Sequence, residues 1–202
     1  MPIINMVYKK KKWKREPWAN TLAYFPLTDN ENDVLGNYTL PISWTKQDIG
    51  YRYISNGYNT RITVSNTQRF VSFWTKINWY TANWAQTLYA TNWWPYYIYY
   101  DNYSWNKNFK ISANNRWYTI ANASTEQWIW YHFAYWWNWT TAFCYLNGEL
   151  VWSKDVSCDI WTNPLFLVRI DLVYSDLIFE SAVRTAEQVA EYYNGTKWKY
   201  WL

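Results

Sequence analysis

Histidine and cysteine are scarce in this chain of 202 residues, and their scarcity excludes several kinds of site. His132 is the only histidine, so no metal centre built from several imidazoles can form. The two cysteines, Cys144 and Cys158, are too few for a cysteine-rich zinc module or a scaffold held by many disulfides. They can pair with each other, but two buried thiols are the more frequent arrangement in a non-oxidising compartment.

Glycine and long apolar runs are also scarce. The chain has 5 glycines against 19 tryptophans and 21 tyrosines, and its apolar runs are too short and too polar to cross a bilayer. A hydrophobic content of 50% excludes a disordered tail, so we expect one soluble globular domain. Buried indole and phenol groups need hydrogen-bond partners, so many of these rings should lie partly exposed in a binding surface or an interface.

The net charge of +4 is concentrated in an N-terminal segment that contains Lys9–Lys12, Lys14 and Arg15. We interpret residues 1–19 as a basic N-terminal arm and residues 20–202 as one domain. Such an arm is usually solvated and mobile, and the alternative is that it docks on an acidic partner surface. Nucleic acid is not an expected partner, because the basic residues are not interleaved with the aromatic ones. Met1–Val7 precedes the charges, the reverse of the order in a secretory signal, so no signal peptide is recognised.

From about Thr21 onward, short segments rich in β-branched and aromatic residues alternate with Asn, Gly, Ser and Thr, which predicts an all-β fold. The fold class expected is an antiparallel two-sheet jelly-roll sandwich with one short C-terminal helix. The helix is indicated by a capping box at Thr185 and Gln188, and Asn194-Gly195 ends it. The expected strands are Leu22–Leu27, Tyr38–Ser43, Tyr51–Ser55, Arg61–Ser65, Arg69–Ile77, Gln86–Thr91, Tyr96–Tyr100, Phe109–Ala113, Trp117–Ala121, Ile129–Trp136, Thr141–Leu146, Glu149–Lys154, Leu165–Ile170 and Leu177–Glu180.

Asn147-Gly148 is the clearest turn signal, because both residues tolerate the positive φ of a type I′ hairpin turn. A two-residue loop pairs Leu146 with Glu149 and continues without interruption. One face of this hairpin then carries Phe143, Tyr145, Leu150 and Trp152, and the other carries Cys144, Leu146, Glu149 and Val151. Both faces have apolar groups, so the face that meets the core stays open.

Three stretches together resemble the concanavalin A-like lectin/glucanase superfamily, in its laminin-G-like form. The stretches are Trp130–Tyr135 (WYHFAY), Tyr145–Val151 (YLNGELV) and Ser175–Glu180 (SDLIFE) leading into Thr185–Asn194 (TAEQVAEYYN), and Ala23–Leu27 with Asp33 and Gly36-Asn37 resembles the opening strand and turn. The likeness runs from about Asn20 to Asn194. It implies an antiparallel jelly roll and a role in recognition or adhesion.

Several tryptophans stand where this family commonly has glycine: Trp93, Trp94, Trp105, Trp139 and Trp161. Tryptophan is a poor turn residue, because positive φ is hard for any residue with a Cβ atom. Two explanations stay open. The chain has a real aromatic surface, or its source organism reads the UGA codon as glycine and the translation wrote tryptophan.

An enzyme is not expected. The resemblance implies that glucanase relatives carry a Glu-x-Asp-x-x-Glu strand, whereas the nearest string here, Glu31–Gly36, lacks the second glutamate and lies in an expected turn. No expected strand presents two carboxylates at i and i+2 or i+4 on one face. His132 is interpreted as a hydrogen-bonded structural histidine, because no activated nucleophile is recognisable beside it.

The only metal considered is calcium. Asp29 and Asp33, with Glu31 between them, offer oxygen ligands of the kind that Ca²⁺ prefers, and the resemblance implies that relatives often carry such an ion. The alternative is an acidic turn that is merely solvated. No other cofactor is expected.

The strongest candidate for a ligand site is the aromatic segment between residues 79 and 105. Aromatic rings suit the C–H faces of sugars, and neighbouring polar groups can hydrogen-bond the hydroxyls. The alternative is that rings such as Tyr97 and Tyr99 simply fill the core between the sheets. The predicted ligand-binding residues are Trp93, Trp94, Tyr97, Tyr99, Asp101, Asn102 and Trp105.

These features favour a non-catalytic recognition or adhesion module, carbohydrate-binding, that works outside the cell or at a virion surface. Its expected partner is a glycan or surface polysaccharide, without nucleic acid and without membrane insertion. The alternative from another class is a structural virion (phage) or surface-assembly subunit. Its aromatic faces would then contact further copies of itself, as a homo-oligomer, or a virion scaffold.

Removal of residues 1–17 is expected to leave the domain folded, because the family-like chain begins near Asn20 and charged residues contribute little to a core. Thermal unfolding of the truncated protein, followed by circular dichroism beside the full chain, checks this. Loss of a cooperative transition would contradict it and would show that the segment adds a strand.

Overall fold

The computed structural model of the chain describes most of the domain and none of the basic run near the N-terminus. The residues described are 19–27, 32–40, 45–47, 49–53, 58–59, 62, 69–78, 86–91, 96–101, 108–113, 116–124, 126, 128–138, 140–155, 165–167 and 172–200.

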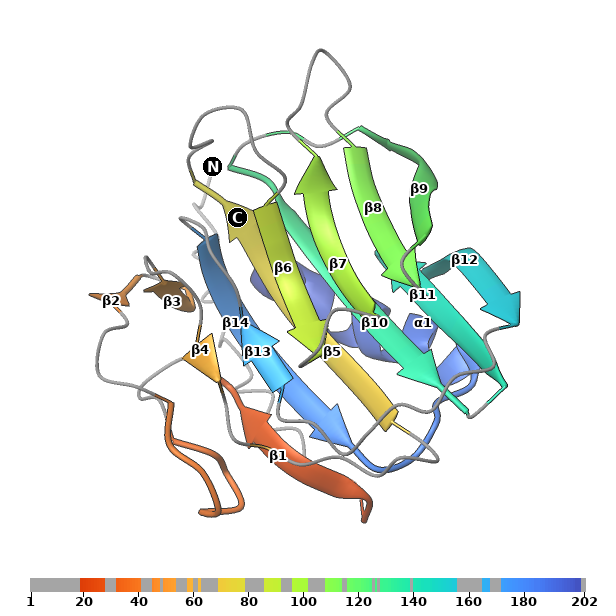
Figure 1. The fold of residues 1–202 in the computed structure, drawn as a ribbon. Coiled ribbons are helices and arrows are strands. Elements are labelled where there is room, and N and C mark those ends of the chain that lie inside the picture. The colour runs from red at the N-terminus through yellow and green to blue at the C-terminus, as the bar shows by residue number, and fades with distance from the viewer. Residues whose placement is uncertain are drawn as a thin grey trace, which may run out of the picture.

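The described strands form two antiparallel sheets that pack face to face (Figure 1). The eight-stranded sheet has the order β12-β11-β10-β5-β14-β3-β2, with β1 paired to β14 as well, and the six-stranded sheet has the order β4-β13-β6-β7-β8-β9. The first contains β1 (Thr21–Phe25), β2 (Thr45–Lys46), β3 (Tyr51–Tyr53), β5 (Arg69–Ile77), β10 (Trp130–Trp137), β11 (Thr141–Leu146), β12 (Glu149–Asp155) and β14 (Leu172–Glu180). The second contains β4 (Tyr58–Asn59), β6 (Gln86–Thr91), β7 (Tyr96–Asp101), β8 (Asn108–Ala113), β9 (Arg116–Ser124) and β13 (Leu165–Leu167).

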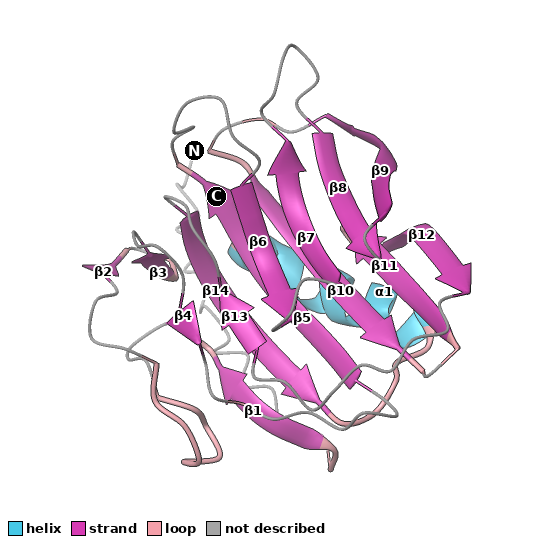
Figure 2. Ribbon diagram, in the orientation of Figure 1, coloured by secondary structure: helices cyan, strands magenta, loops and turns pink. Residues whose placement is uncertain are grey.

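The central strands of the eight-stranded sheet are buried on both faces. Along β5, Val71 and Phe73 belong to the core between the sheets, whereas the alternate residues Phe70 and Trp74 pack on the opposite side. This explains why β10 and β14 are buried throughout and read as nearly continuous apolar runs. The six-stranded sheet covers one face and a helix covers the other (Figure 2).

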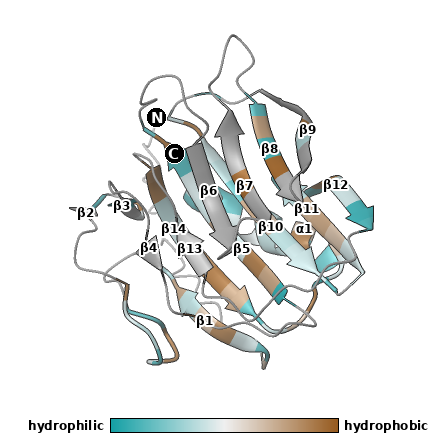
Figure 3. Cartoon of the chain, viewed as in Figure 1, coloured by the Kyte–Doolittle hydropathy of each residue, from teal (hydrophilic) through white to brown (hydrophobic). Residues whose placement is uncertain are grey.

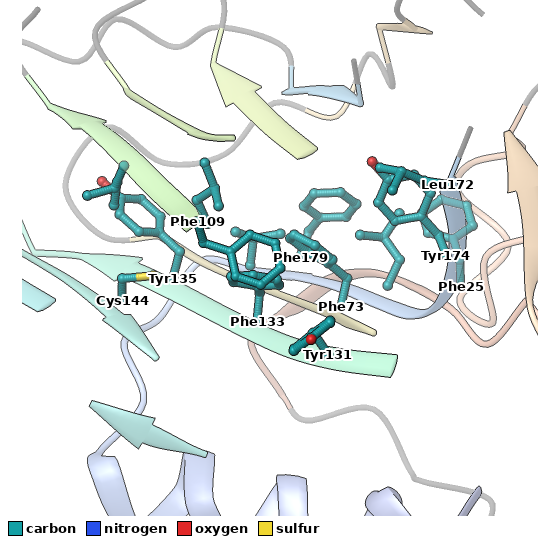
Figure 4. Close-up of a cluster of buried hydrophobic side chains, with 14 of the residues drawn as sticks. Phe25, Phe73, Phe109, Tyr131, Phe133, Tyr135, Cys144, Leu172, Tyr174 and Phe179 are labelled. Atoms are coloured by element: carbon teal, nitrogen blue, oxygen red, sulfur yellow. The ribbon is translucent and has the colours of Figure 1, made fainter. Parts of the chain in front are cut away.

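The core between the sheets is built largely from aromatic rings (Figure 4). Phe133 of β10 stacks on Phe73 with ring centroids 5.6 Å apart, and Phe109 of β8 meets Phe133 edge to face at 4.6 Å. Since Phe109 belongs to the six-stranded sheet and Phe133 to the other, this contact ties the two sheets together.

The helix α1 (Ala186–Thr196) begins with the predicted capping box. The Thr185 side chain accepts a hydrogen bond from the Gln188 backbone N–H, and the Gln188 side chain accepts one from the Thr185 N–H. The buried Val189 packs with Phe70 of β5. α1 therefore lies on the face of the eight-stranded sheet that points away from the six-stranded sheet, as Figures 1 and 2 show.

Beyond α1, a short 3₁₀ helix η1 (Lys197–Lys199) leads to Tyr200, which locks the C-terminal segment onto the sheet. The ring of Tyr200 stacks on Trp74 at 4.1 Å, and its hydroxyl lies 2.9 Å from Asp176 Oδ2. Lys199 Nζ contacts the same carboxylate oxygen at 2.8 Å. The Tyr24 hydroxyl donates to Asp176 Oδ1 at 3.0 Å, so this one buried carboxylate joins three segments of the chain.

The predicted fold class is confirmed, and β5, β6 and β11 have the predicted bounds. Tyr38–Ser43 was wrong as a strand: the described part, to residue 40, has only an isolated bridge between Asn32 and Thr39. The predicted strand Leu177–Glu180 was too short, because β14 begins at Leu172. Most of Arg61–Ser65 lies outside the described residues.

The hairpin of β11 and β12 keeps the predicted turn but not the predicted register. Leu146 pairs with Glu149 and Tyr145 with Leu150, as expected, but Cys144 then pairs with Trp152 instead of Val151. The extra residue is a β-bulge, which shifts Trp152 to the core side, where it packs with Cys144. The prediction that Trp152 shares a face with Phe143 and Tyr145 was therefore wrong.

Within the described ranges, no helix has the length and apolar character that crossing a membrane requires.

Tyr200→Phe is expected to destabilise the domain near neutral pH by about 1–3 kcal/mol, because Asp176 loses a buried donor. Burial, and next the charge of Asp176, raise the pKa of Tyr200 well above its usual value near 10. The folded state therefore keeps a proton that the unfolded state loses above pH 10, and this contribution to stability, complete at lower pH, disappears as the pH rises toward the folded-state pKa.

Urea unfolding of wild type and Tyr200→Phe between pH 8 and 11 checks this, with a flatter alkaline decline expected for the variant. Tyr193→Phe is the comparison variant: Tyr193 also stacks on Trp74, at 5.5 Å, and burial raises its pKa too, but it is only partly buried, so its replacement should flatten the decline less. Equal alkaline slopes in wild type and Tyr200→Phe would contradict the prediction.

Candidate functional site

The outer face of the six-stranded sheet is the candidate site, and the buried residues of its strands define it. Ile98 of β7, Phe109 and Ile111 of β8, and Ile120 of β9 are at most 1% exposed and belong to the core. Successive strand residues occupy opposite faces of a sheet, so the residues between these four belong to the outer face. Figure 3 shows hydrophobic and hydrophilic bands alternating along β8.

Strand register brings two rows of residues together on this face. Tyr97 of β7 pairs with Ser112 of β8, which pairs with Trp117 of β9. One step along, Tyr99 pairs with Lys110, which pairs with Thr119. Neighbouring strands lie about 4.8 Å apart, so each row is about 10 Å wide, the width of a sugar residue or two.

The exposure of the described side chains agrees with an open face. Thr119 is exposed, and Asn108 and Lys110 are partly exposed, while Phe109 between them is fully buried. In the described part of the chain no helix or strand covers this face, whereas α1 occupies the outer face of the other sheet (Figure 1). A ligand can therefore approach the six-stranded sheet without displacing a described element.

Of the predicted ligand-binding residues, Tyr97, Tyr99 and Asp101 lie in β7, which also carries the buried Ile98. Tyr97 and Tyr99 are the positions on either side of Ile98 in β7, and their role in ligand binding stays a prediction. The others, Trp93, Trp94, Asn102 and Trp105, lie outside the described residues. Sequence reasoning missed Lys110 and Thr119, although the alternation around Phe109 and Ile120 was a signal for them.

Asp33, one of the two predicted calcium ligands, is a buried residue that closes a turn. Its Oδ1 accepts hydrogen bonds from the backbone N–H of Tyr24 at 2.7 Å and of Leu35 at 3.2 Å, and its Oδ2 accepts one from Asn37 at 3.2 Å. Asp29 lies outside the described residues, so calcium binding stays a prediction. Among the residues described, no cluster of three or more His, Cys, Asp and Glu side chains has the spacing of a metal site.

The predicted strand Leu177–Glu180 left out Asp176, but β14 extends back to Leu172 and includes both Asp176 and Glu180. Both are fully buried, and each has a cation: Lys199 for Asp176 at 2.8 Å and Arg184 for Glu180 at 2.6 Å. Four residues of strand separate them by about 13 Å. Glycosidase pairs lie about 5–9.5 Å apart, so these two do not form one.

His132 and Cys144 are structural residues. His132 is fully buried, its Nε2 lies 2.8 Å from Ser72 Oγ, and its backbone N–H donates to Asn147 Oδ1 at 3.0 Å, which anchors the β11–β12 turn. This agrees with the predicted structural role. Cys144 is a free buried thiol, and burial raises its pKa to about 12, so it is protonated and unreactive near neutral pH.

No family model matches the chain, and no curated protein matches it. Solved structures do match. The chain superposes on Trypanosoma rangeli sialidase with a TM-score of 0.73 and 10% identity, covering 90% of this chain and 33% of that one. It therefore spans about a third of the sialidase.

Two further matches are single domains of larger proteins. Domain 4 of an extracellular arabinanase of Geobacillus stearothermophilus, in complex with arabinotriose, has a TM-score of 0.59 and 18% identity, covering 85% of this chain and 97% of that one. The binding domain of botulinum neurotoxin serotype D has a TM-score of 0.62 and 15% identity, covering 88% and 52%. At these identities the likeness shows a shared β-sandwich fold, found in binding domains and within enzymes.

Asp33→Ala is expected to destabilise the domain by about 1–3 kcal/mol, because the buried N–H of Tyr24 loses its acceptor. Asp33→Asn keeps one acceptor oxygen and should lose less. Chemical unfolding of both variants measures the difference. Equal stability of wild type and Asp33→Ala would contradict the turn-closing role. Repeating the wild-type series with Ca²⁺ and with a chelator tests the ion, since a bound ion raises stability.

Proposed function

We propose that this chain is a non-catalytic carbohydrate-binding module of the concanavalin A-like, laminin-G-like type, with its sugar site on the outer face of the six-stranded sheet. The observation that carries the proposal is the register of β7, β8 and β9. It sets Tyr97 and Tyr99 beside Ser112, Lys110 and Thr119 on a face that no described element covers.

The chemistry of these residues fits a sugar. A tyrosine ring offers an apolar face to the C–H groups of a pyranose or furanose, and hydroxyl and ammonium groups beside it can hydrogen-bond the sugar hydroxyls. Tyr97 and Tyr99 occupy the same face of one strand, two residues or about 6.6 Å apart. That spacing suits successive residues of an extended chain, so the proposed ligand is a polysaccharide rather than a monosaccharide.

The comparison with the arabinanase domain supports this proposal, because that domain was solved with arabinotriose and nearly its whole length matches this chain. The absence of catalysis is proposed on geometry. The two carboxylates of β14, Asp176 and Glu180, are buried, neutralised and too far apart for glycoside hydrolysis. The proposed place of action is a cell or virion surface, where polysaccharides are exposed.

Tyr97→Ala and Tyr99→Ala are each expected to weaken binding to an immobilised polysaccharide about 2- to 10-fold, the loss for one aromatic contact of 0.5–1.5 kcal/mol. Neither change should lower the unfolding temperature much, since both positions lie opposite the core. A glycan array that includes arabinan fragments selects the ligand, and titration calorimetry then measures the affinity of each variant.

Trp198→Ala is the matched control, because Trp198 is an exposed aromatic residue, 44% accessible, in η1 near α1 and so on the side of the other sheet. It should leave the affinity unchanged, and Tyr99→Phe should retain most of it. The proposal fails if no glycan on a broad array binds the intact protein, or if Trp198→Ala weakens binding as much as Tyr99→Ala.

A further inference from the structure

Trp128 has a backbone conformation that tryptophan rarely adopts. Its φ is +69°, in the left-handed region, and its N–H donates to the Ile77 carbonyl at 3.0 Å just before β10 begins at Trp130. The left-handed conformation brings Cβ too close to the following carbonyl oxygen in any residue except glycine. The hydrogen bond to Ile77 comes from the backbone, so it requires the conformation and not the indole.

The other described non-glycine residues with positive φ each have a compensation that Trp128 lacks. Asn147 and Asp176 have short polar side chains, which tolerate this region. Leu27 is fully buried in the core, so its packing offsets the strain. Trp128 is 58% exposed, and its ring makes no stacking or cation–π contact with the part of the chain that the structure describes.

Other tryptophans of the domain behave as tryptophan should. Trp74 is fully buried and stacks on Tyr200 at 4.1 Å, and its Nε1 donates to Thr196 Oγ1 at 3.2 Å. Trp136 is buried and stacks on Phe143 at 3.9 Å. Thus some tryptophan positions make use of an indole, whereas the backbone at position 128 favours glycine.

Composition points the same way. A chain of this length ordinarily has about 14 glycines, at roughly 7% of residues, and this one has 5 beside its 19 tryptophans.

We propose that the natural protein has glycine at position 128, and that the source organism reads the UGA codon as glycine. The buried, packed positions 74 and 136 are then tryptophan, encoded by UGG. The same reassignment extends to position 139 and to Trp93, Trp94, Trp105 and Trp161, which lie outside the described residues.

This inference does not depend on the proposed function, but it bears on the proposed site. Tyrosine codons are unaffected by the reassignment, so Tyr97 and Tyr99 remain. A sugar site that relied on Trp93, Trp94 and Trp105 would lose its rings. The proposed carbohydrate site therefore rests on the tyrosines of β7.

Peptide mass spectrometry of the protein purified from its source organism tests the proposal, together with the codons of the gene. The expected result is glycine at 128, encoded by UGA, and tryptophan at 74 and 136, encoded by UGG. Tryptophan found at position 128 of the natural protein would overturn the proposal. Glycine at 128, 74 and 136 alike would contradict the position-specific assignment.

The stability of recombinant variants tests the part of the proposal that concerns backbone strain at position 128. Trp128→Gly, made in an organism with the standard code, should raise the folded-to-unfolded ratio about fivefold, by relief of the left-handed strain. Trp128→Ala is the matched control: it also removes the indole but keeps Cβ, so it should bring no such gain. Equal effects of the two changes, or a loss of stability with Trp128→Gly, would overturn the argument from φ.

Discussion

The candidate site lies on the six-stranded sheet because the C-terminal segment packs against the outer face of the eight-stranded sheet. Trp74 lies at the centre of this packing: the rings of Tyr193 and Tyr200 both stack on it, and its indole N–H donates to Thr196 Oγ1. Each of these contacts joins β5 to the last described turns of the chain. Without them, the apolar outer face of the eight-stranded sheet would be open.

Asp176 makes the polar contacts between the C-terminal segment and the sheet. Removing a carboxylate from water costs free energy. The ion pair with Lys199 offsets this cost only if the carboxylate oxygens also accept further hydrogen bonds. Tyr24 and Tyr200 satisfy them, so β1, β14 and η1 are held in one arrangement. The same requirement explains the positive φ of Asp176: the bulge in β14 turns its carboxylate toward these partners.

Much of the fold could be predicted because alternation, turn residues and the capping box are local signals. The predictions failed where contacts with residues far along the chain determine the structure. The predicted strand began at Leu177, after the polar pair Ser175-Asp176, yet both are buried inside β14, with Tyr200 supplied from the far end of the chain. On the site, the tyrosines of β7 could be found from composition. Lys110 could not be placed beside Tyr99 without the register of β7 on β8.

The bulge at Val151 has a consequence for how copies of the domain meet. β12 is the last strand in the described order of its sheet, so the backbone groups along its outer side are available to pair with a strand from another molecule. The bulge interrupts that row, and Lys154 and Asp155 place exposed charges along it. Edge-to-edge polymerisation through β12 is thereby disfavoured. Copies of the domain can therefore lie close together without fusing their sheets into a fibre.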